Sequence, residues 1–405
     1  MNSRIAYISN EYPPLIYGGL GVYVDYISHE LSGLGQKVSV FTVSDGLVKD
    51  YETQGNIEIF REKPISIKDG LEIFLSSQTL DWGSGLDFLL DLFSYNQLSA
   101  ANVLKQEHFD LCVAHDWLGL LGGMAVKRNG IPMIYHVHGL EIGRSSNPNL
   151  QILELERKGA EVADLVITVS QAMKQEVAEL GIDPHKVRVC YHGVDAEFFN
   201  PAEARPEKIR FLQSRYGLDE NDLVILFVGR LEPVKGIIQL IQAIPSVKKI
   251  HPQVKLLIVG KGNLERLVKK AAEDQDSIIL VNDFLSPEDK RDHYALADLC
   301  IFPSTYEPFG IVALEAAAMG KAAIVGARGV SGLREIVIPP GSARPTGVHV
   351  NALDPVDIAW GINLAFEDLQ RLKEWGKNAR QRVLQEFTWR KAAEKTLEIY
   401  WEAMR

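Results

Sequence analysis

Residues 302–320 read FPSTYEPFGIVALEAAAMG and combine the patterns of a strand end, a turn and a helix. Its first residues continue the apolar run LCI and predict the end of a buried strand. The middle, TYEPFG, predicts a turn, because proline and glycine favour turn conformations. The Ala-rich part from Ile311 predicts a short helix, and Gly320 is typical of the residue that ends one. A strand, a tight turn and a helix in this order are the building unit of parallel α/β sheets.

The start of this helix has no residue suited to capping it. The first amides of a helix have no partner within the helix and usually bond to a Ser, Thr, Asp or Asn side chain. Pro308, Phe309 and Gly310 supply no such side chain. We therefore expect the amides of Gly310, Ile311 and Val312 to form an anion site, strengthened by the positive end of the helix dipole.

Two acids bracket this expected anion site. Glu307 precedes it, and Glu315 lies one turn inside the helix. Carboxylates repel an anion, so they suit hydroxyl groups attached to it, such as those of sugars on either side of a diphosphate. The alternative is a strand, a turn and a buried helix with two incidental glutamates.

The whole chain has the composition of a globular protein with more than one domain. Its 405 residues exceed the size at which single cores stop growing, roughly 250 to 300 residues. The net charge of -10 argues against a nucleic-acid surface, which is normally basic. Cys112, Cys190 and Cys300 lie far apart in apolar runs and are expected to be buried thiols.

No apolar run approaches the roughly 18 to 20 residues of a membrane helix, and the first residues lack the apolar core of a signal peptide. We therefore expect a cytoplasmic protein without an integral membrane segment. The basic segment KIRFLQSR at 208–215 could touch a membrane surface or form a solvated helix.

Apolar strands alternate with helical stretches in two successive cycles, which predicts two doubly wound, Rossmann-like parallel-sheet domains. The first cycle contains seven expected strands, at 4–9, 37–42, 71–76, 110–115, 133–138, 165–170 and 187–192. The second contains five, at 223–229, 254–260, 277–281, 299–304 and 322–327. We place the domains at 1–198 and 199–386, with residues 193–222 as the linker region and a terminal helix at 387–405 packing back onto the first domain.

Polar residues follow several of these strands, where parallel sheets bind ligands. In the first domain these residues are the Gly18-Gly19-Leu20 turn, His115-Asp116-Trp117, and His138. In the second, Arg230 ends the first strand and Lys235 precedes the next helix. If the two sheets presented these edges to one another, they would form an interdomain cleft in which both cations faced an anion.

Several of these signals have simpler explanations. The glycine turn is a weak motif, because no acid follows at the spacing typical of dinucleotide sites. His115 and His136 alternate with apolar neighbours and could be satisfied core residues. Asp274 and Asp276 form the only Asp-x-Asp, which we expect to lie on the surface. No Cys/His set has zinc spacing, so we predict no metal site.

Taken together, these residues resemble a retaining glycosyltransferase of the GT-B fold, over nearly the whole chain. Glu307 to Glu315 is similar to the E-x7-E motif of glycosyltransferase family four. Arg230 and Lys235 match the paired basic residues of that family, and Gly18-Gly19-Leu20 matches its N-terminal glycine loop.

The segment EYPPLIYGGLGVYV, the His-Asp-Trp motif and HVHGLEIGR look most like glycogen and starch synthases. Bacterial glycogen synthases differ from this chain at Tyr17, Phe309 and Glu315. The resemblance implies transfer of a hexose, glucose from ADP- or UDP-glucose, to an α-glucan. A small-molecule, sugar-phosphate or lipid acceptor is the alternative.

The resemblance also implies roles for individual residues. The donor diphosphate would be held by Arg230, Lys235, Phe309, the amides of Gly310, Ile311 and Val312, and the Gly18-Gly19-Leu20 loop. Glu315 would bind the ribose and Glu307 the donor sugar. His138 would lie beside the reacting carbon, and Asp116 and Trp117 toward the acceptor.

The family mechanism implies same-face attack with retention and with neither metal nor cofactor. Other classes stay open: a sugar-nucleotide epimerase or phosphorylase of the same fold, a nicotinamide oxidoreductase, a sugar-binding protein, or a glycosidase using Glu307 and Glu315. Oligomeric state does not follow from these residues.

Overall fold

The computed structural model describes residues 2–66, 84–106, 108–144, 147–283 and 285–405, and these divide into two compact units. Unit 1 comprises residues 1–169, 174–190 and 389–405, and unit 2 comprises residues 170–173 and 191–388. The chain thus passes between units at Cys190/Tyr191, earlier than the 198/199 boundary expected above. None of the helices in the described residues combines the length and the hydropathy of a membrane-spanning segment.

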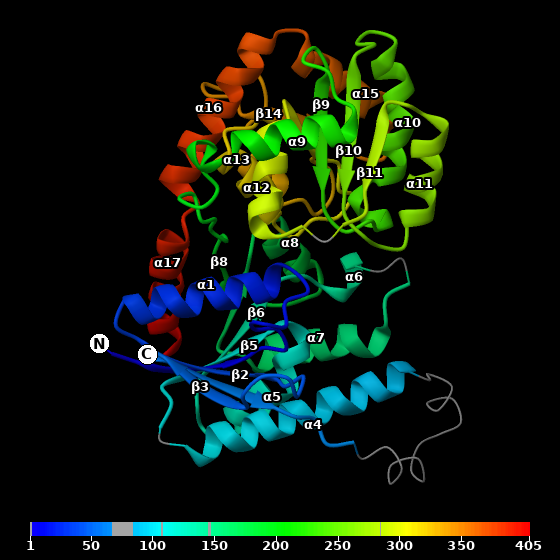
Figure 1. Ribbon diagram of the computed structural model, residues 1–405. Helices are drawn as coiled ribbons and strands as arrows, with labels where there is room; N and C mark the ends of the chain where they lie inside the picture. The colour runs from blue at the N-terminus through cyan, green and yellow to red at the C-terminus, as the bar shows by residue number, and fades with distance from the viewer. Residues whose placement is uncertain (1, 67–83, 107, 145–146, 284) are drawn as a thin grey trace. The chain divides into compact units, whose positions relative to one another are not determined.

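Unit 1 is built on an eight-stranded sheet in the order β3-β4-β2-β1-β5-β6-β7-β8, parallel except for the β3–β4 pair (Figure 1). Its strands are β1 (Arg4–Ile8), β2 (Lys37–Val43), β3 (Tyr51–Gln54), β4 (Ile57–Glu62), β5 (Leu111–His115), β6 (Met133–Val137), β7 (Leu165–Thr168) and β8 (Val187–Val189). Its helices are α1 (Gly19–Gly33), α4 (Ser84–Lys105), α5 (Asp116–Arg128), α6 (Glu141–Arg144), α7 (Leu150–Val162), the single turn η2 (Pro184–Lys186) and α17 (Trp389–Ala403). Helix α8 (Gln171–Glu179) begins in unit 2 and ends in unit 1.

Unit 2 is built on a six-stranded parallel sheet in the order β11-β10-β9-β12-β13-β14. Its strands are β9 (Leu223–Val228), β10 (Val254–Val259), β11 (Ile278–Val281), β12 (Leu299–Phe302), β13 (Ala323–Gly326) and β14 (Gly347–Val350). Its helices are α9 (Pro206–Tyr216), α10 (Ile237–Lys248), α11 (Glu265–Asp274), α12 (Pro287–Leu296), α13 (Ile311–Ala318), α14 (Leu333–Ile336), α15 (Pro355–Phe366) and α16 (Leu369–Glu386), with short turns η3 (Pro201–Glu203) and η4 (Pro233–Lys235).

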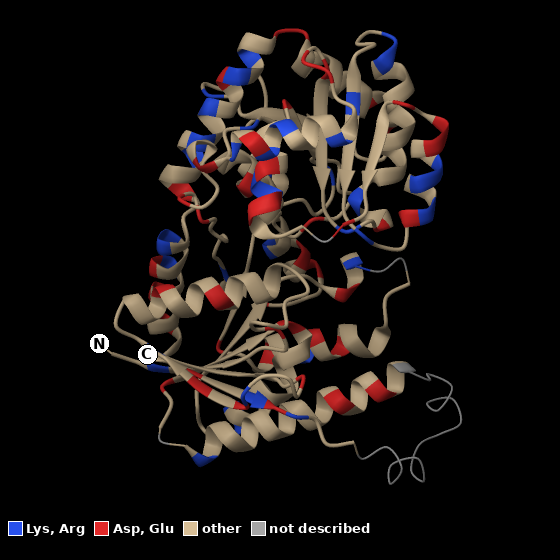
Figure 2. Ribbon diagram, viewed as in Figure 1, with Lys and Arg blue, Asp and Glu red and all other residues tan. Residues whose placement is uncertain are grey.

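Both sheets lie between layers of helices. Every residue of β9, LVILFV, is buried, as expected for a parallel strand covered on both faces. In unit 2, α10, α11 and α15 share one core with the sheet, and α9, α12 and α13 lie on its other side (Figure 1). In Figure 2 the charged residues gather on helices and loops, while most strand residues carry no charge. The prediction of two doubly wound parallel-sheet domains is therefore confirmed.

Three strands were missed in the sequence. β3 and β4 form an edge hairpin in which β4 alternates buried and half-buried residues, and β14 is only four residues long. Their short or mixed patterns lack the continuous apolar run used to find the others. The strand expected at 71–76 lies outside the described residues.

In unit 1 the C-terminal helix α17 packs against α1, and the Tyr400 hydroxyl bonds to that of Tyr7, 2.8 Å away. Both tyrosines are fully buried. The aromatic spacing of 387–404 therefore marks a buried face, and α17 completes the core of unit 1.

Candidate active site

The centre of the unit 2 sheet brings together two residues from the predicted site. Numbered along the chain, its strands run in the order 3-2-1-4-5-6. In sheets with this order, ligands bind beyond the carboxyl ends of the two central strands, here β9 and β12, where the strand order reverses. Lys235 follows β9 and Glu307 follows β12, and their Nζ and Oε2 atoms lie 2.6 Å apart. The two loops are also joined by the Thr305 amide, which donates to the Val234 carbonyl at 2.8 Å.

Helix α13 begins beside this ion pair without a side-chain cap. Its first internal bond runs from the Ala313 amide to the Gly310 carbonyl at 2.9 Å. Among the described residues, the amides of Gly310, Ile311 and Val312 have no protein acceptor. Such a helix end attracts anions, because free N–H groups and the helix dipole act together.

Gly310 can adopt this turn because it lacks a side chain. Its φ is +107°, and a Cβ atom would lie 2.3 Å from Leu333 Cδ2. Gly236, between Lys235 and α10, has φ +69°, and a Cβ there would lie 1.9 Å from the Pro303 carbonyl oxygen. These two glycines allow the loops after β9 and β12 to approach closely.

Arg230 lies in the same loop as Lys235 but is exposed. Among the described residues it forms no ion pair, whereas Lys235 is paired with Glu307. The structure thus brings Lys235, Glu307 and the α13 amides together, and it places Arg230 after the same strand without a contact to them.

Glu315 is buried and already has two partners within unit 2. Lys290 Nζ lies 2.6 Å from its Oε1, and the Tyr294 hydroxyl donates to its Oε2 at 2.9 Å. Each carboxylate oxygen can accept more than one hydrogen bond, so these partners fix its orientation without saturating it. Lys290 and Tyr294 were missed, because a lysine and a tyrosine in a polar helix carry no distinctive sequence signal.

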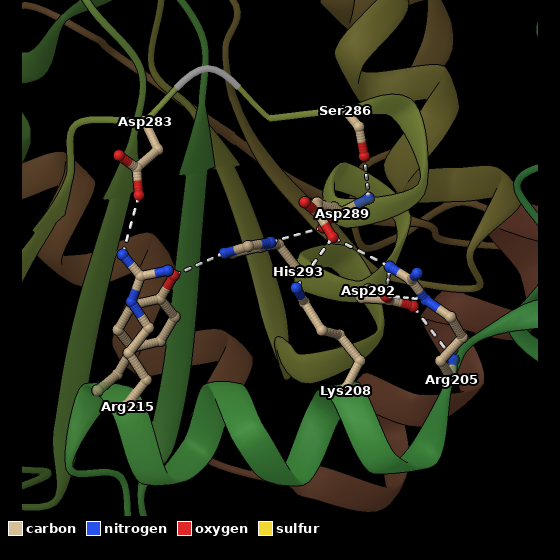
Figure 3. A network of polar contacts seen from close by, with 9 residues as sticks. Arg205, Lys208, Arg215, Asp283, Ser286, Asp289, Asp292 and His293 are labelled. Atoms are coloured by element: carbon tan, nitrogen blue, oxygen red, sulfur yellow. Dashed lines mark hydrogen bonds and ion pairs between the residues drawn. The ribbon is translucent and has the colours of Figure 1, made fainter.

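Helix α12, which carries both partners of Glu315, is itself held by α9. Arg205 Nε donates to Asp292 Oδ2 at 2.7 Å, and Lys208 Nζ lies 3.2 Å from Asp289 Oδ1 (Figure 3). Asp292 is fully buried, so this pair is more than a surface contact. The basic segment at 208–215 is therefore part of a helix whose charges partly face α12.

In unit 1, the glycine loop has an internal acceptor. Glu11 Oε2 accepts hydrogen bonds from the amides of Tyr17, Gly18 and Gly21, at 2.9, 3.1 and 3.2 Å. The Gly18 amide, expected to contact donor phosphate, is therefore engaged within the loop. Gly19 begins α1, and Gly18, the N-cap residue before it, supplies no side-chain cap. Sequence reasoning missed Glu11, which lies before two prolines and shows no motif of its own.

Asp116 organises the other polar cluster of unit 1. Its Oδ1 accepts from the His138 amide at 2.6 Å, and its Oδ2 accepts from Arg144 Nη2 at 2.7 Å. The φ of Asp116 is +53°, a positive value that residues other than glycine rarely adopt. Such backbone strain is typical of functional sites. His138 Nε2 lies 3.1 Å from His115 Nδ1. Trp117 is half-buried beside the exposed ring of Phe88.

Among the described residues, His115, His136 and His138 form one group of three side chains close enough to share a metal ion, with their ring nitrogens within 4.8 Å of one another. Their rings are stacked, with angles of 15° to 29° between planes. Imidazole lone pairs lie in the ring plane, so nearly parallel rings do not aim at one ion. Binding a shared metal would require the rings to turn.

A buried acid supports the loop after His138. Glu156 on α7 is fully buried and accepts from the Glu141 amide at 3.1 Å. Burial is the main reason that the pKa of Glu156 is raised from 4.5 to about 8. Arg144 lies against Gly139, where a Cβ would come within 2.7 Å of its Nη2. Neither Glu156 nor Arg144 was identified from the sequence.

Models of known protein families match residues of both units. The family model described as Glycosyltransferase Family 4 matches residues 17–198, and the model described as Glycosyl transferases group 1 matches residues 208–382. These ranges contain the glycine loop and the E-x7-E motif respectively.

Relatives align over nearly the whole chain. An uncharacterized glycosyltransferase of Methanocaldococcus jannaschii is 31% identical, covering 99% of this chain and 98% of its own. The alpha-maltose-1-phosphate synthase of Mycolicibacterium smegmatis is 29% identical, covering 98% of each. A glycogen synthase of Mycobacterium tuberculosis is also 29% identical, covering 99% and 95%.

Solved structures share the fold. The catalytic domain of starch synthase IV from Arabidopsis thaliana, bound to ADP and acarbose, has a TM-score of 0.80 at 16% identity, with 100% of both chains covered. An Anabaena protein in complex with UDP-glucose has a TM-score of 0.74 at 20% identity, with 98% and 99% covered. With two parallel-sheet domains and these relatives, the chain belongs to the family-four glycosyltransferases of the GT-B fold.

Proposed function

We propose that this glycosyltransferase moves a hexose from a nucleoside-diphosphate sugar to a carbohydrate acceptor, with retention and without a metal. One observation carries the donor part of the proposal. The uncapped N-terminus of α13 lies in the same loop cluster as Lys235, at the edge where β9 and β12 diverge. A diphosphate would receive both the helix amides and an ammonium group there.

The leaving diphosphate gains negative charge as the bond to the sugar breaks. Lys235 and the amides of Gly310, Ile311 and Val312 are fixed before the reaction, so they can stabilise that charge without reorganising. Arg230 is exposed and must turn toward the phosphates to contribute. These groups would do what a metal ion does in other transferases, and neither metal nor cofactor is needed in this scheme.

Glu307 has two tasks in this proposal. It orients Lys235 through the 2.6 Å ion pair, and Ser304 Oγ holds the same oxygen at 3.2 Å. Its other oxygen would accept from a hydroxyl of the donor sugar. Glu315, held by Lys290 and Tyr294, would accept from the ribose.

The acceptor-side groups belong to unit 1. His138, positioned by Asp116, would lie next to the reacting carbon, and Trp117 with Phe88 offers aromatic rings for stacking on a sugar. We propose an α-glucan acceptor, ADP- or UDP-glucose as donor, and a cytoplasmic location. The glycogen synthase and starch synthase among the similar proteins support the glucan.

A sugar-phosphate acceptor is the second candidate. It is favoured by the alpha-maltose-1-phosphate synthase, which is as similar to this chain as the glycogen synthase is. The two candidates share the donor site and differ only in the acceptor.

A two-step assay tests the proposal. A panel of UDP-, ADP- and GDP-sugars is first screened for thermal stabilisation of the protein. The best donor is then offered with glycogen, maltooligosaccharides, glucose 1-phosphate and a lipid acceptor. Elongation of a glucan with release of the nucleoside diphosphate supports the first proposal, and transfer only to glucose 1-phosphate supports the second. Consumption of the donor without any acceptor would instead indicate an epimerase or hydrolase.

A further inference from the structure

Unit 2 contains a groove of about 570 Å³ at the C-terminal end of α13, opposite the end that carries the expected donor site, and this volume is typical of small-molecule sites. It lies between the outward face of α16 and the loop that ends α13. Its lining combines charged and amide side chains of α16 with the apolar side chains of Pro201, Met319 and Leu384.

Three cations line this groove, and no carboxylate does. Lys373, Lys377 and Arg380 repeat at helical spacing on α16, so they share one face. The chain has more acidic than basic residues, with a net charge of -10, so acids that could neutralise these cations are common in it. The lack of an acid in the lining therefore favours an anionic ligand.

Two other cations of α16 are neutralised by acids. Arg371 is paired with Glu367 at 3.1 Å, and Arg382 with Glu386 at 2.8 Å. Within the described part of the chain, none of the three groove cations forms an ion pair. The paired arginines lie outside the groove, and the unpaired cations lie inside it.

Arg380 also has a structural task. Its Nη1 donates to the Phe199 carbonyl at 3.2 Å and to the Ala318 carbonyl, near the end of α13. This fixes the guanidinium beside the groove. The two lysines have no such task and are exposed.

We propose that this groove binds the phosphate monoester of a small organic molecule, at a site separate from the donor site. The phosphate would lie between Lys373, Lys377 and Arg380, with Gln370 and Gln381 as further hydrogen-bond donors. The apolar side chains of Pro201, Met319 and Leu384 would contact the organic part.

The groove lies at one end of α13, and the expected donor site lies at the other. The eight residues of α13 span about 12 Å at the usual rise per residue. An anion that drew Arg380 toward itself would change the contact at the Ala318 carbonyl. The ligand is therefore suited to the role of an effector rather than a substrate.

Glucose 6-phosphate serves as the probe, titrated calorimetrically into the full-length protein. Inorganic phosphate and glucose are the comparison ligands. The double variant Lys373→Ala/Lys377→Ala leaves the structural contacts of Arg380 in place. Lys269→Ala/Lys270→Ala, on the exposed face of α11, removes the same charge elsewhere. Lys235→Ala tests whether the probe is binding at the donor site instead.

We expect saturable binding of glucose 6-phosphate, weaker binding of inorganic phosphate and none of glucose. The groove double variant should bind at least about tenfold more weakly, since hydrogen bonds to charged groups are lost. The α11 double variant and Lys235→Ala should bind as the wild type does. No saturable binding, equal binding by all variants, loss only in Lys235→Ala, or binding only to anionic phospholipid vesicles would overturn the proposal.

Discussion

Lys235 and Glu307 form an ion pair of 2.6 Å although 72 positions separate them in the chain. They meet because β9 and β12 are neighbours at the centre of the sheet and their loops leave the same edge. Both side chains are less than one-fifth exposed, so the ammonium group is held in place before any ligand arrives. The pair links the two sequence motifs of the predicted donor site.

Replacing Lys235 should lower turnover without unfolding the protein. Lys235→Ala removes one fixed cation beside the leaving phosphate. Loss of a group of this kind typically lowers the turnover number about 10²-fold to 10³-fold. Steady-state kinetics with the best donor measures the effect, and the unfolding temperature shows that the fold is retained. Lys249→Ala, an exposed change after α10, is the matched control. Near-normal turnover in Lys235→Ala would contradict the assignment.

Gly310→Ala should destabilise unit 2 by about 1 to 3 kcal/mol, the usual cost of forcing a side chain into such a conformation. The new Cβ would also meet Leu333 Cδ2 and push the start of α13 out of place. Gly33→Ala, at the end of α1, has open space around its Cβ and should leave stability unchanged or slightly raised. Denaturant unfolding of both variants measures the difference. Equal stability of the two would show that the Gly310 turn is not constrained.

Asp116 should tolerate asparagine better than alanine. Asparagine accepts a positive φ more readily than alanine does, and its carbonyl can still accept from the His138 amide. Asp116→Ala leaves that buried amide without its acceptor, at a cost of about 1 to 3 kcal/mol. We expect the order of stability to be wild type, then Asn, then Ala, with the turnover number falling in the same order. If alanine were as stable as asparagine, the network around His138 would lack the role assigned to it.

Glu156 should make stability depend on pH. Its folded pKa of about 8 lies above the ordinary 4.5, so between these values the folded state holds a proton that the unfolded state has lost. This contribution is complete below about pH 4.5 and disappears as the pH rises through about 8, with a slope of about 1.4 kcal/mol per pH unit in between.

Glu156→Gln keeps an acceptor for the Glu141 amide and removes the titration. The wild type should therefore lose stability relative to this variant between pH 5 and pH 8. Urea unfolding of both proteins at several pH values gives the difference directly. If the stability of both proteins changed in parallel between pH 5 and pH 8, the pKa of Glu156 would not be raised in the folded protein.

The long buried strands and the turn at Glu307 could be predicted because their signals are local. A continuous apolar run such as β9 and an uncapped helix start such as α13 are visible in a few consecutive residues. Strand order was not predicted from the sequence, yet it is what brings Lys235 to Glu307.

The residues that were missed act through distant partners. Glu11 occupies amides of the glycine loop, Arg144 pairs with Asp116, and Lys290 with Tyr294 holds Glu315. Each is a common residue type whose role depends on which atom it meets after folding. A single sequence gives no local signal for such a contact.

In the proposed donor site, the free amides of α13 and Lys235 bind the diphosphate of a nucleotide sugar. Calorimetric titration of UDP and ADP into the wild type and Lys235→Ala tests it most directly, with uridine and adenosine as ligands that lack phosphate. We expect saturable binding of at least one diphosphate to the wild type, weaker by about tenfold or more in the variant, since a charge-assisted contact is lost. Equal affinity of the two proteins for that diphosphate, or no binding of either diphosphate to the wild type, would contradict it.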